Sequence, residues 1–240
     1  MATNPRRILS TMSNRFWLNF SCYLSVLIFF IAFVIINGSI VVGDKEAHQL
    51  SINIPQVFYF SLFCLIFGWP YFASEVFNFL LFVKRHKLLI TLSISISVLV
   101  IYFNTVVHPY LLADNRHFIF YVWNRFYGKY WWFRYSMIPV YIFSLYVIIK
   151  LVWDKSDISF SLVFFPAVTL LLIFQSLIEV RYFLVPYLII RLRIQNKDSA
   201  VFNVVLELIT YFVINMITFN IFFTKTLHWE GMRHVQRIIW

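Results

Sequence analysis

The stretch LLITLSISISVLVIYFNTVV at residues 88–107 contains no charged side chain. A helix rises about 1.5 Å per residue, so about 20 apolar residues cross the hydrocarbon core of a bilayer. The stretch therefore predicts a membrane-spanning helix. Five further runs have the same apolar character and bring the expected number of spans to about six: Phe16–Val42, Val57–Ala73, Ser136–Trp153, Ile158–Ile178 and Ala200–Phe223.

The composition of the whole chain agrees with these runs. Hydrophobic residues make up 61% of the chain and charged residues 12%, and the mean hydropathy is +0.79. Soluble domains carry about 25% charged residues, so this composition excludes an ordinary soluble domain. Both faces of each run are apolar, which favours helices over alternating barrel strands. We predict an all-α, polytopic transmembrane protein with residues 1–240 as a single transmembrane region.

The basic residues give a weak indication of orientation. We place the amino-terminal arginines in the cytoplasm and let the six spans alternate. That assignment puts Lys84, Arg85, Lys87, Lys155, Lys225, Arg233 and Arg237 on the cytoplasmic side, and Arg116, Arg125, Lys129, Arg134, Arg181, Arg191, Arg193 and Lys197 on the other. Either a span is miscounted, for example at Phe118–Trp123, or the residues of the second group hold a phosphate or pyrophosphate group.

Two kinds of anionic partner could account for the net charge of +10. Anionic lipid head groups or a phosphorylated lipid substrate would both fit it. Nucleic acid is not expected as a partner, because the charges are scattered among loops and do not form one basic domain.

The densest polar cluster follows the run at residues 88–107 and reads HPYLLADNRH at residues 108–117. Arg116 could bind phosphate, because its planar fork stays charged and can bind two oxygens. Asp114 could orient Arg116 or accept a sugar hydroxyl, and His108 or His117 could move a proton near neutral pH. The alternative is an ordinary interfacial loop in which Asp114 and Arg116 pair with neighbours. The spacing matches no familiar metal-ligand pattern, so no metal site is expected.

A second polar pair, Glu179 and Arg181, opens directly off the run Ile158–Ile178. Ionisable groups at a membrane boundary can be functional, although a local ion pair is an equal alternative. The chain has five glycines and no glycine-rich phosphate loop or dinucleotide-binding pattern. No cofactor is expected.

Several of these segments together resemble a known family, the endoplasmic-reticulum α-1,2-glucosyltransferases. These enzymes use dolichyl-phosphate glucose to add the last glucose to the lipid-linked oligosaccharide of N-glycosylation. The similarity covers the carboxyl-terminal half of the family. It rests on residues 108–117 running into Phe120–Trp123, on Asn37–Asp44, Pro55–Gln56 and Phe58–Phe60, on Glu179–Phe183 with Pro186–Tyr187, and on Gln236–Trp240.

The resemblance implies a GT-C scaffold, a multi-pass location in the endoplasmic-reticulum membrane, and an inverting transfer. Its implied partners are dolichyl-phosphate glucose, the lipid-linked oligosaccharide and membrane lipids. An inverting transfer needs a carboxylate base and cationic help for the departing phosphate. Arg116 and Arg181 are the candidates for the phosphate, and Asp114, Asn115 and His117 for the sugar or acceptor. His108 and Glu179 complete the expected substrate-binding set.

The resemblance also has a gap. Members of the family are much longer, and their first lumenal loop carries the acidic motif expected to supply the base. Residues 43–56 hold only Asp44 and Glu46, in a context that matches a later part of the family. No catalytic residue is assigned for that reason. A non-catalytic membrane accessory protein, such as a potassium-channel modulator, and an inactive fragment remain as alternatives.

Overall fold

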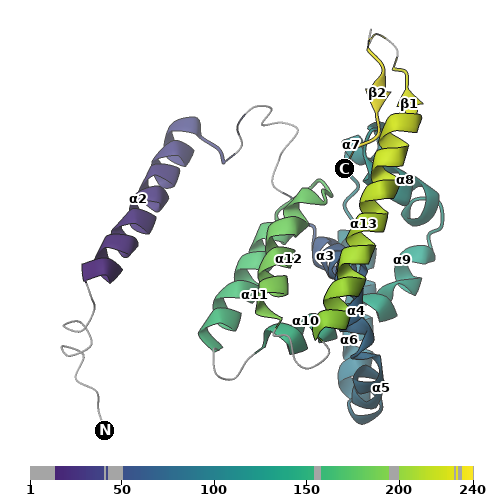
Figure 1. The fold of residues 1–240 in the computed structure, drawn as a ribbon, viewed down its shortest axis with the longest axis horizontal. Coiled ribbons are helices and arrows are strands. Elements are labelled where there is room, and N and C mark those ends of the chain that lie inside the picture. Colours follow the sequence, from purple (N-terminus) through teal and green to yellow (C-terminus); the bar gives the residue numbers. More distant parts are fainter. Residues whose placement is uncertain are drawn as a thin grey trace. The chain divides into compact units, whose positions relative to one another are not determined.

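The structure is a computed structural model that describes residues 14–40, 42, 51–153, 158–194, 200–229, 231 and 234–239. Asp44 and Glu46 lie outside these residues. The chain divides into two units, Met1–Gln49 and Leu50–Trp240. The first unit contains helix α2 (Asn14–Asn37), which is drawn in purple in Figure 1.

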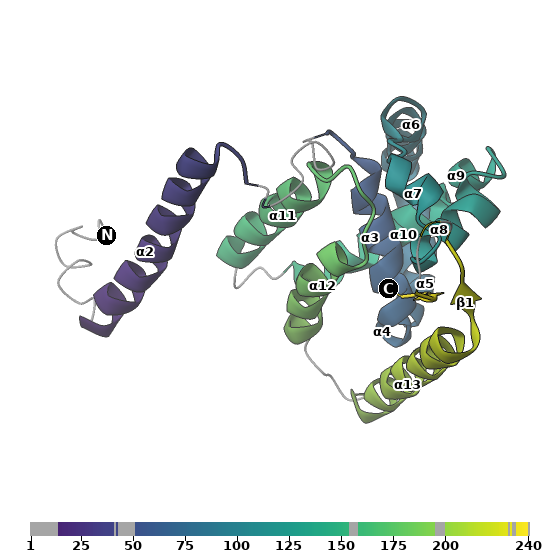
Figure 2. The same cartoon turned by 90° about the horizontal axis from the view of Figure 1, so that it is seen from above.

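The second unit is almost entirely helical, which confirms the all-α prediction. Two short strands follow its last helix and pair antiparallel, with Thr226 opposite Arg237 and Leu227 opposite Gln236. Figures 1 and 2 show the elements from two directions. Their bounds are α3 (Pro55–Phe67), α4 (Trp69–Ala73), α5 (Val76–Arg85), α6 (Lys87–Asn104), α7 (Pro109–Ala113), α8 (Phe118–Val122), the π-helix η1 (Trp123–Tyr127), α9 (Phe133–Ser136), α10 (Ile138–Val152), α11 (Ile158–Ile173), α12 (Arg181–Arg193), α13 (Ala200–Thr224), β1 (Thr226–Leu227) and β2 (Gln236–Arg237).

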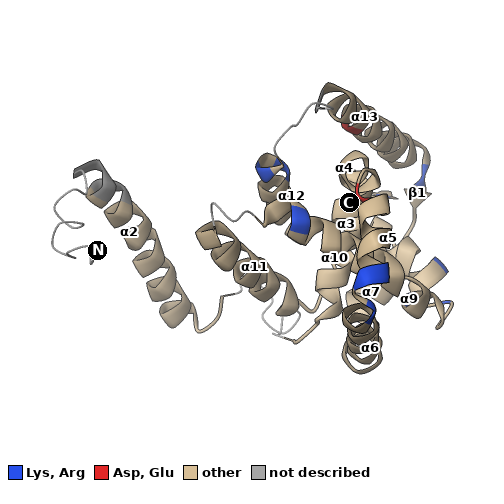
Figure 3. Cartoon of the chain, turned by 90° about the horizontal axis from the view of Figure 1, so that it is seen from below, with Lys and Arg blue, Asp and Glu red and all other residues tan. Residues whose placement is uncertain are grey.

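Within the described ranges, four helical segments are long and apolar enough to cross a membrane. They are Phe20–Asn37, Lys87–Asn104, Phe133–Val152 and Val201–Thr224. Helices α3 and α11 are apolar but shorter. Figure 3 shows that most of the helical ribbon carries neither acidic nor basic residues. The chain is therefore a polytopic membrane protein, as its composition indicates.

The expected span Val57–Ala73 is divided at Gly68, between α3 and α4. A Cβ atom at Gly68 would lie 2.9 Å from the carbonyl oxygen of Cys64, so the backbone approaches too closely for a side chain there. Pro70 lies in the first turn of α4, where its missing N–H does not interrupt a helical hydrogen bond. The break therefore follows from the sequence Gly68-Trp69-Pro70.

The expected span Ile158–Ile178 ends early, at Ile173. Gln56 is fully buried at the start of α3, and its Nε2 donates to the carbonyl oxygens of Gln175 (3.2 Å) and Leu177 (2.9 Å). The backbone N–H of Asn53 donates to the carbonyl oxygen of Ile173 at 2.7 Å. These bonds give partners to backbone carbonyl groups of the irregular segment after α11, which would otherwise be left without hydrogen bonds in lipid.

Helix α12 was not among the expected spans, although it connects the two ends of the second unit. Helix α12 runs parallel to α3, because successive aromatic rings of the two helices meet in the same order. Phe63 contacts Phe183 (5.8 Å between ring centroids), and Phe67 contacts Tyr187 (6.3 Å). The thirteen residues of α12 extend about 20 Å. Helix α13 then returns in the opposite direction, because Arg191 near the end of α12 bonds Glu207 near the start of α13.

This added helix changes the topology. The tail after α13 contacts the loop between α7 and α8, through bonds described below, so the two lie at the same end of the unit. The expectation that the tail with Lys225 and Arg237 lies across the membrane from Arg116 is therefore wrong. The expectation that Arg191 and Arg193 share a side with Arg116 is also wrong, because Arg191 bonds Glu207 near the start of α13 and the tail follows the other end of that helix. The sequence pattern hid α12 because arginines at both of its ends lower its average hydropathy.

Candidate functional site

The centre of the predicted site is a bidentate ion pair in the loop between α7 and α8. Arg116 donates from Nε to Asp114 Oδ1 at 2.9 Å and from Nη2 to Asp114 Oδ2 at 2.7 Å. The backbone N–H of Arg116 also donates to Asp114 Oδ1, at 3.0 Å. Three bonds between residues two positions apart fix the plane of the guanidinium.

The pair also fixes the protonation state of the carboxylate. Hydrogen bonds from Arg116 lower the pKa of the Asp114 carboxyl, and burial opposes them only in part. The same contacts raise the pKa of the Arg116 guanidinium. Asp114 is therefore ionised near neutral pH, with both oxygens occupied. A carboxylate in this state is a weak proton acceptor and is suited to orient Arg116.

The carboxyl-terminal tail completes this site. Trp229 lies against Arg116, with the guanidinium carbon 4.7 Å from the ring centroid, and its Nε1 donates to Asn115 Oδ1 at 2.8 Å. Farther along the tail, the backbone N–H of Ile239 donates to the Arg116 carbonyl oxygen at 2.6 Å. The N–H of Phe118 donates back to the Ile239 carbonyl oxygen at 3.2 Å. The tail thus holds both the backbone and the side chain of Arg116.

The hairpin of β1 and β2 brings the tail to this position. Arg237 in β2 donates from Nη1 to the carbonyl oxygens of Phe222 (3.3 Å) and Phe223 (2.9 Å) in the last turn of α13. The last carbonyl groups of a helix lack partners within the helix, so a basic side chain stabilises them. These bonds hold β2 against the end of α13, and the residues after β2 then lie beside the loop that carries Arg116.

The two histidines of the cluster have different environments. His117 lies beside the ion pair, with Nε2 3.5 Å from Asp114 Oδ2. His108 lies at the other end of α7, where Nδ1 accepts a hydrogen bond from the backbone N–H of Tyr110 at 3.1 Å. Asp114, Asn115, Arg116 and His117 thus form one cluster, and His108 caps the short helix that precedes it.

The second predicted pair forms as the sequence analysis allowed. Arg181 Nη2 lies 2.6 Å from Glu179 Oε2, at the start of α12. The Arg181 side chain is 66% exposed and the Glu179 side chain 19% exposed. An exposed arginine retains most of its hydration, so this pair contributes little to stability. Arg181 can therefore change partners at small cost.

A cavity of about 360 Å³ connects the segments that carry the two pairs. Phe118 and Ile119, directly after His117, line it on one side, and Ile178 and Val180, on either side of Glu179, line it on another. The remaining lining residues come from α3, α8, η1, α12 and α13, and they are Tyr59, Leu62, Phe63, Ile66, Phe67, Val122, Trp123, Tyr127, Phe183 and Ile214. Almost all of these side chains are apolar, so the cavity suits a hydrocarbon chain.

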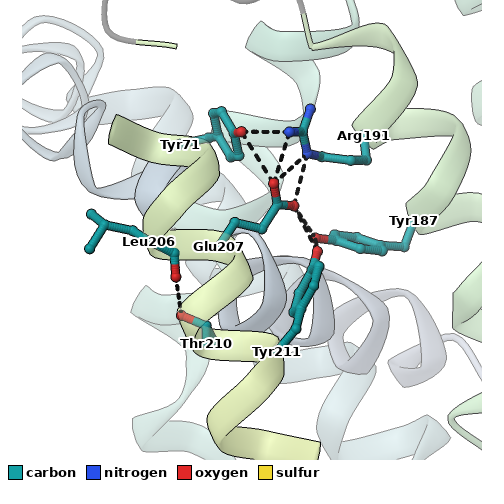
Figure 4. A network of polar contacts seen from close by, with 7 residues as sticks. All are labelled: Tyr71, Tyr187, Arg191, Leu206, Glu207, Thr210 and Tyr211. Atoms are coloured by element: carbon teal, nitrogen blue, oxygen red, sulfur yellow. Dashed lines mark hydrogen bonds and ion pairs between the residues drawn. The ribbon is translucent and has the colours of Figure 1, made fainter. Parts of the chain in front are cut away.

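A buried polar cluster surrounds Glu207 and was not predicted from the sequence (Figure 4). Glu207 is 4% exposed. It accepts hydrogen bonds from Arg191 Nε (2.8 Å to each carboxylate oxygen), from the hydroxyl of Tyr211 (2.7 Å), and from those of Tyr71 and Tyr187 (3.3 Å each). An acid inside an apolar run was the available signal. Its partners come from α4 and α12, which the sequence did not resolve as separate helices.

No described group of three or more His, Cys, Asp or Glu side chains could hold a metal ion. The Arg116 cluster brings together an oriented guanidinium, an amide and an imidazole, and it directly precedes Phe118 and Ile119, which line the apolar cavity.

Comparison with known proteins gives one family. Residues 2–192 match the family model described as "DIE2/ALG10 family". A Drosophila melanogaster protein named Dol-P-Glc:Glc(2)Man(9)GlcNAc(2)-PP-Dol alpha-1,2-glucosyltransferase is 43% identical over 218 residues, which are 91% of this chain and 48% of that protein. Homo sapiens and Arabidopsis thaliana proteins of the same name are 38% and 34% identical, over 91% and 97% of this chain and 46% and 48% of their own lengths.

This chain spans about half the length of the curated relatives that it matches. No solved structure is significantly similar.

Proposed function

Because this chain belongs to the DIE2/ALG10 family, we propose that it carries part of the substrate site of a dolichyl-phosphate-glucose-dependent α-1,2-glucosyltransferase. The names of the relatives specify a glucose donor on dolichyl phosphate and an oligosaccharide acceptor on dolichyl pyrophosphate. We propose both as partners here, with the endoplasmic-reticulum membrane as the location.

The observation that carries this proposal is the orientation of Arg116 in a loop that leads directly into the lining of an apolar cavity. The bonds to Asp114 use Nε and Nη2 of Arg116, which leaves Nη1 for a phosphate oxygen. Phe118 and Ile119 follow within three positions and line the cavity. A polyprenyl phosphate has the same two parts, an anionic head and a long hydrocarbon chain. Arg116 would stabilise the negative charge that develops on the departing phosphate.

The other predicted residues receive roles from their positions. Asn115 and His117 lie beside Arg116, where they can bind sugar hydroxyls. Glu179 and Arg181 flank Val180, which lines the cavity, and they can bind a second phosphate or the acceptor. Asp114 orients Arg116 and is not assigned as the base. No described residue of this chain is assigned as the catalytic base.

The test of this proposal is the loss of the gene that encodes this chain. The lipid-linked oligosaccharide should then accumulate as Glc(2)Man(9)GlcNAc(2), one glucose short, because the final transfer fails. Profiling of the released oligosaccharides by chromatography measures this directly. Re-expression of the gene should restore the missing glucose. A normal precursor after loss of the gene would contradict the proposal and favour a non-catalytic role.

A further inference from the structure

A larger cavity lies between α5, α6 and α10. Its volume is about 700 Å³, within the usual range for a small-molecule site. The side chains that line it include Phe82, Ser93, Ser97, Tyr146, Lys150 and Trp153. They are apolar except near one end, where Lys150 and Trp153 complete the wall.

The two serines in this wall do not make it polar. Ser93 Oγ donates to the carbonyl oxygen of Leu89 at 2.9 Å, and Ser97 Oγ donates to that of Ser93 at 2.8 Å. A serine hydroxyl that bonds the preceding turn of its own helix is already satisfied. The cavity thus accepts a hydrocarbon chain without leaving a buried hydroxyl unpaired.

A second cavity of about 590 Å³ adjoins the first, and Phe82, Tyr146 and Lys150 line both. The second cavity is lined in addition by Lys84, Arg85 and His86, at the junction of α5 and α6, and by Asn78 and Leu81. The basic stretch at this junction is drawn in blue in Figure 3. A hydrocarbon-lined cavity therefore opens beside a basic one.

The charges at this rim do not cancel. Lys150 forms an ion pair with Glu75, which also accepts a hydrogen bond from Asn78 Nδ2 at 2.9 Å. Lys84 and Arg85 are exposed, and Lys87 follows at the start of α6. Glu75 thus neutralises one cation, and an excess of positive charge remains beside the apolar cavity.

We propose that this pair of cavities binds an anionic glycerophospholipid. The phosphate lies beside Lys84 and Arg85, and one acyl chain lies between α6 and α10. Charge complementarity selects this occupant, because basic residues at the end of membrane helices attract anionic head groups. Lys150 lies near the end of α10, whereas Tyr127, which lines the cavity of about 360 Å³ together with Phe118, bonds Tyr141 near the start of that helix, so the lipid site is separate from the proposed substrate site.

Native mass spectrometry of the purified protein in detergent can test this proposal. The protein is titrated with phosphatidylglycerol, with phosphatidylcholine and with dolichyl phosphate. We expect at least one retained phosphatidylglycerol, bound about tenfold more tightly than phosphatidylcholine. The variant Lys84→Gln/Arg85→Gln should lose about tenfold in affinity for phosphatidylglycerol. The matched control Arg125→Gln/Lys129→Gln removes two exposed cations elsewhere and should keep the wild-type affinity.

A second pair of variants tests the hydrocarbon part of the site. Ser93→Phe adds a ring to the wall of the cavity and should reduce phosphatidylglycerol binding about tenfold. Ser95→Phe places the same ring at an exposed position of α6 outside the lining and should have no effect. Thermal unfolding of each variant shows whether it is folded.

Three outcomes would overturn the proposal. Equal affinity for phosphatidylglycerol and phosphatidylcholine would remove the role of charge. An equal loss in the Arg125/Lys129 control would indicate general surface attraction. Preferential binding of dolichyl phosphate that is lost in Lys84→Gln/Arg85→Gln would assign the site to the isoprenoid lipid. None of these results depends on glucosyltransferase activity.

Discussion

Arg116 and Asp114 illustrate at the scale of single residues how an arginine is prepared for an anionic ligand. A free arginine side chain loses much rotamer entropy when it binds a phosphate. Here the bonds to Asp114 and the contact with Trp229 hold the guanidinium before any ligand arrives. The cost is that Asp114 cancels part of the positive charge. We infer that orientation, more than net charge, is what this loop contributes.

The Asp114–Arg116 pair gives a prediction on pH. The pKa of Asp114 is lower in the folded protein than in the unfolded chain. The pair therefore stabilises the folded protein at pH values above the unfolded pKa of about 4, and this stabilisation is lost as the pH falls through the lower folded pKa. The difference in Tm between the wild type and Asp114→Asn should be constant from pH 8 to pH 5 and shrink below about pH 4. We expect this difference in Tm to be only a few degrees, because the Arg116 side chain is 32% exposed and water weakens an exposed ion pair. A difference that falls between pH 7 and pH 5 would contradict this protonation state.

Trp229 gives a prediction on how Arg116 is held. Trp229→Phe keeps a ring over the guanidinium and loses the bond to Asn115, and Trp229→Ala loses both. Since a hydrogen bond and a cation–π contact contribute about 1 kcal/mol each, we expect transfer rates in membranes to fall about fivefold for Trp229→Phe and about thirtyfold for Trp229→Ala. Trp131, which is 76% exposed, supplies the control, and Trp131→Ala should stay within about twofold. Equal rates for Trp229→Ala and the wild type would show that the tail does not position Arg116.

At the scale of helices, the Glu207 cluster is the main polar connection of α13 to α4 and α12 (Figure 4). Arg191 also donates from Nη2 to the hydroxyl of Tyr71 at 2.6 Å, and the hydroxyls of Tyr187 and Tyr211 lie 2.5 Å apart. Every member therefore has a partner. In a low-dielectric interior, a satisfied network of this kind specifies one packing of the helices, whereas a broken one leaves a charge unpaired.

Removing one partner of the Arg191–Glu207 ion pair should lower the free energy of unfolding more than replacing both partners. Glu207→Ala leaves Arg191 unpaired, and we expect a loss of about 3 kcal/mol in the free energy of unfolding. Arg191→Met/Glu207→Leu replaces the pair by apolar side chains and should cost less than the sum of the single changes. Thermal unfolding in detergent measures the wild type, Glu207→Ala, the single variants Arg191→Met and Glu207→Leu, and the double variant. Additive losses would show that the two residues stabilise the helices independently.

At the scale of the whole second unit, the order of the helices decides which loops meet. Helix α12 follows α3 in parallel and α13 returns, so the tail reaches the loop after α7. The junction of α5 and α6 lies at the other end, beside Lys150 and Glu75. The unit thus has one end with the proposed substrate site and one end with the proposed lipid site. Both ends carry basic residues, which explains the weak charge bias in the sequence.

Cysteine labelling can test this order. In a Cys22→Ser background, Cys64 is fully buried and should not react. Single cysteines at Lys129 and His234 should react with a membrane-impermeant reagent from one side of sealed microsomes, and those at Lys84 and Arg193 only from the other. If the cysteines at Lys129 and His234 reacted from opposite sides, the tail could not contact Arg116 as described.

The sequence predicted those features that depend on average or local properties. The apolar runs indicated a helical membrane protein, and the spacing of Asp114 and Arg116 allowed their pairing. It did not predict α12, because Arg181, Arg191 and Arg193 mask an apolar centre. The partners of Glu207 and the pairing of His117 with Ile239 depend on contacts between distant segments, which no local pattern contains. The motif Gln236–Trp240 was visible as part of a resemblance, but its contact with Arg116 was not.

The most direct test of the central claim is rescue of a cell line that lacks the gene for this chain. Wild-type, Arg116→Ala and Arg125→Ala versions are expressed at equal levels, and the fraction of lipid-linked oligosaccharide with the terminal glucose is measured. We predict that wild type and Arg125→Ala restore the glucose, whereas Arg116→Ala lowers the rate of transfer at least about tenfold, as expected for the loss of one charged donor. Full rescue by Arg116→Ala would contradict the assignment of this cluster to the substrate phosphate.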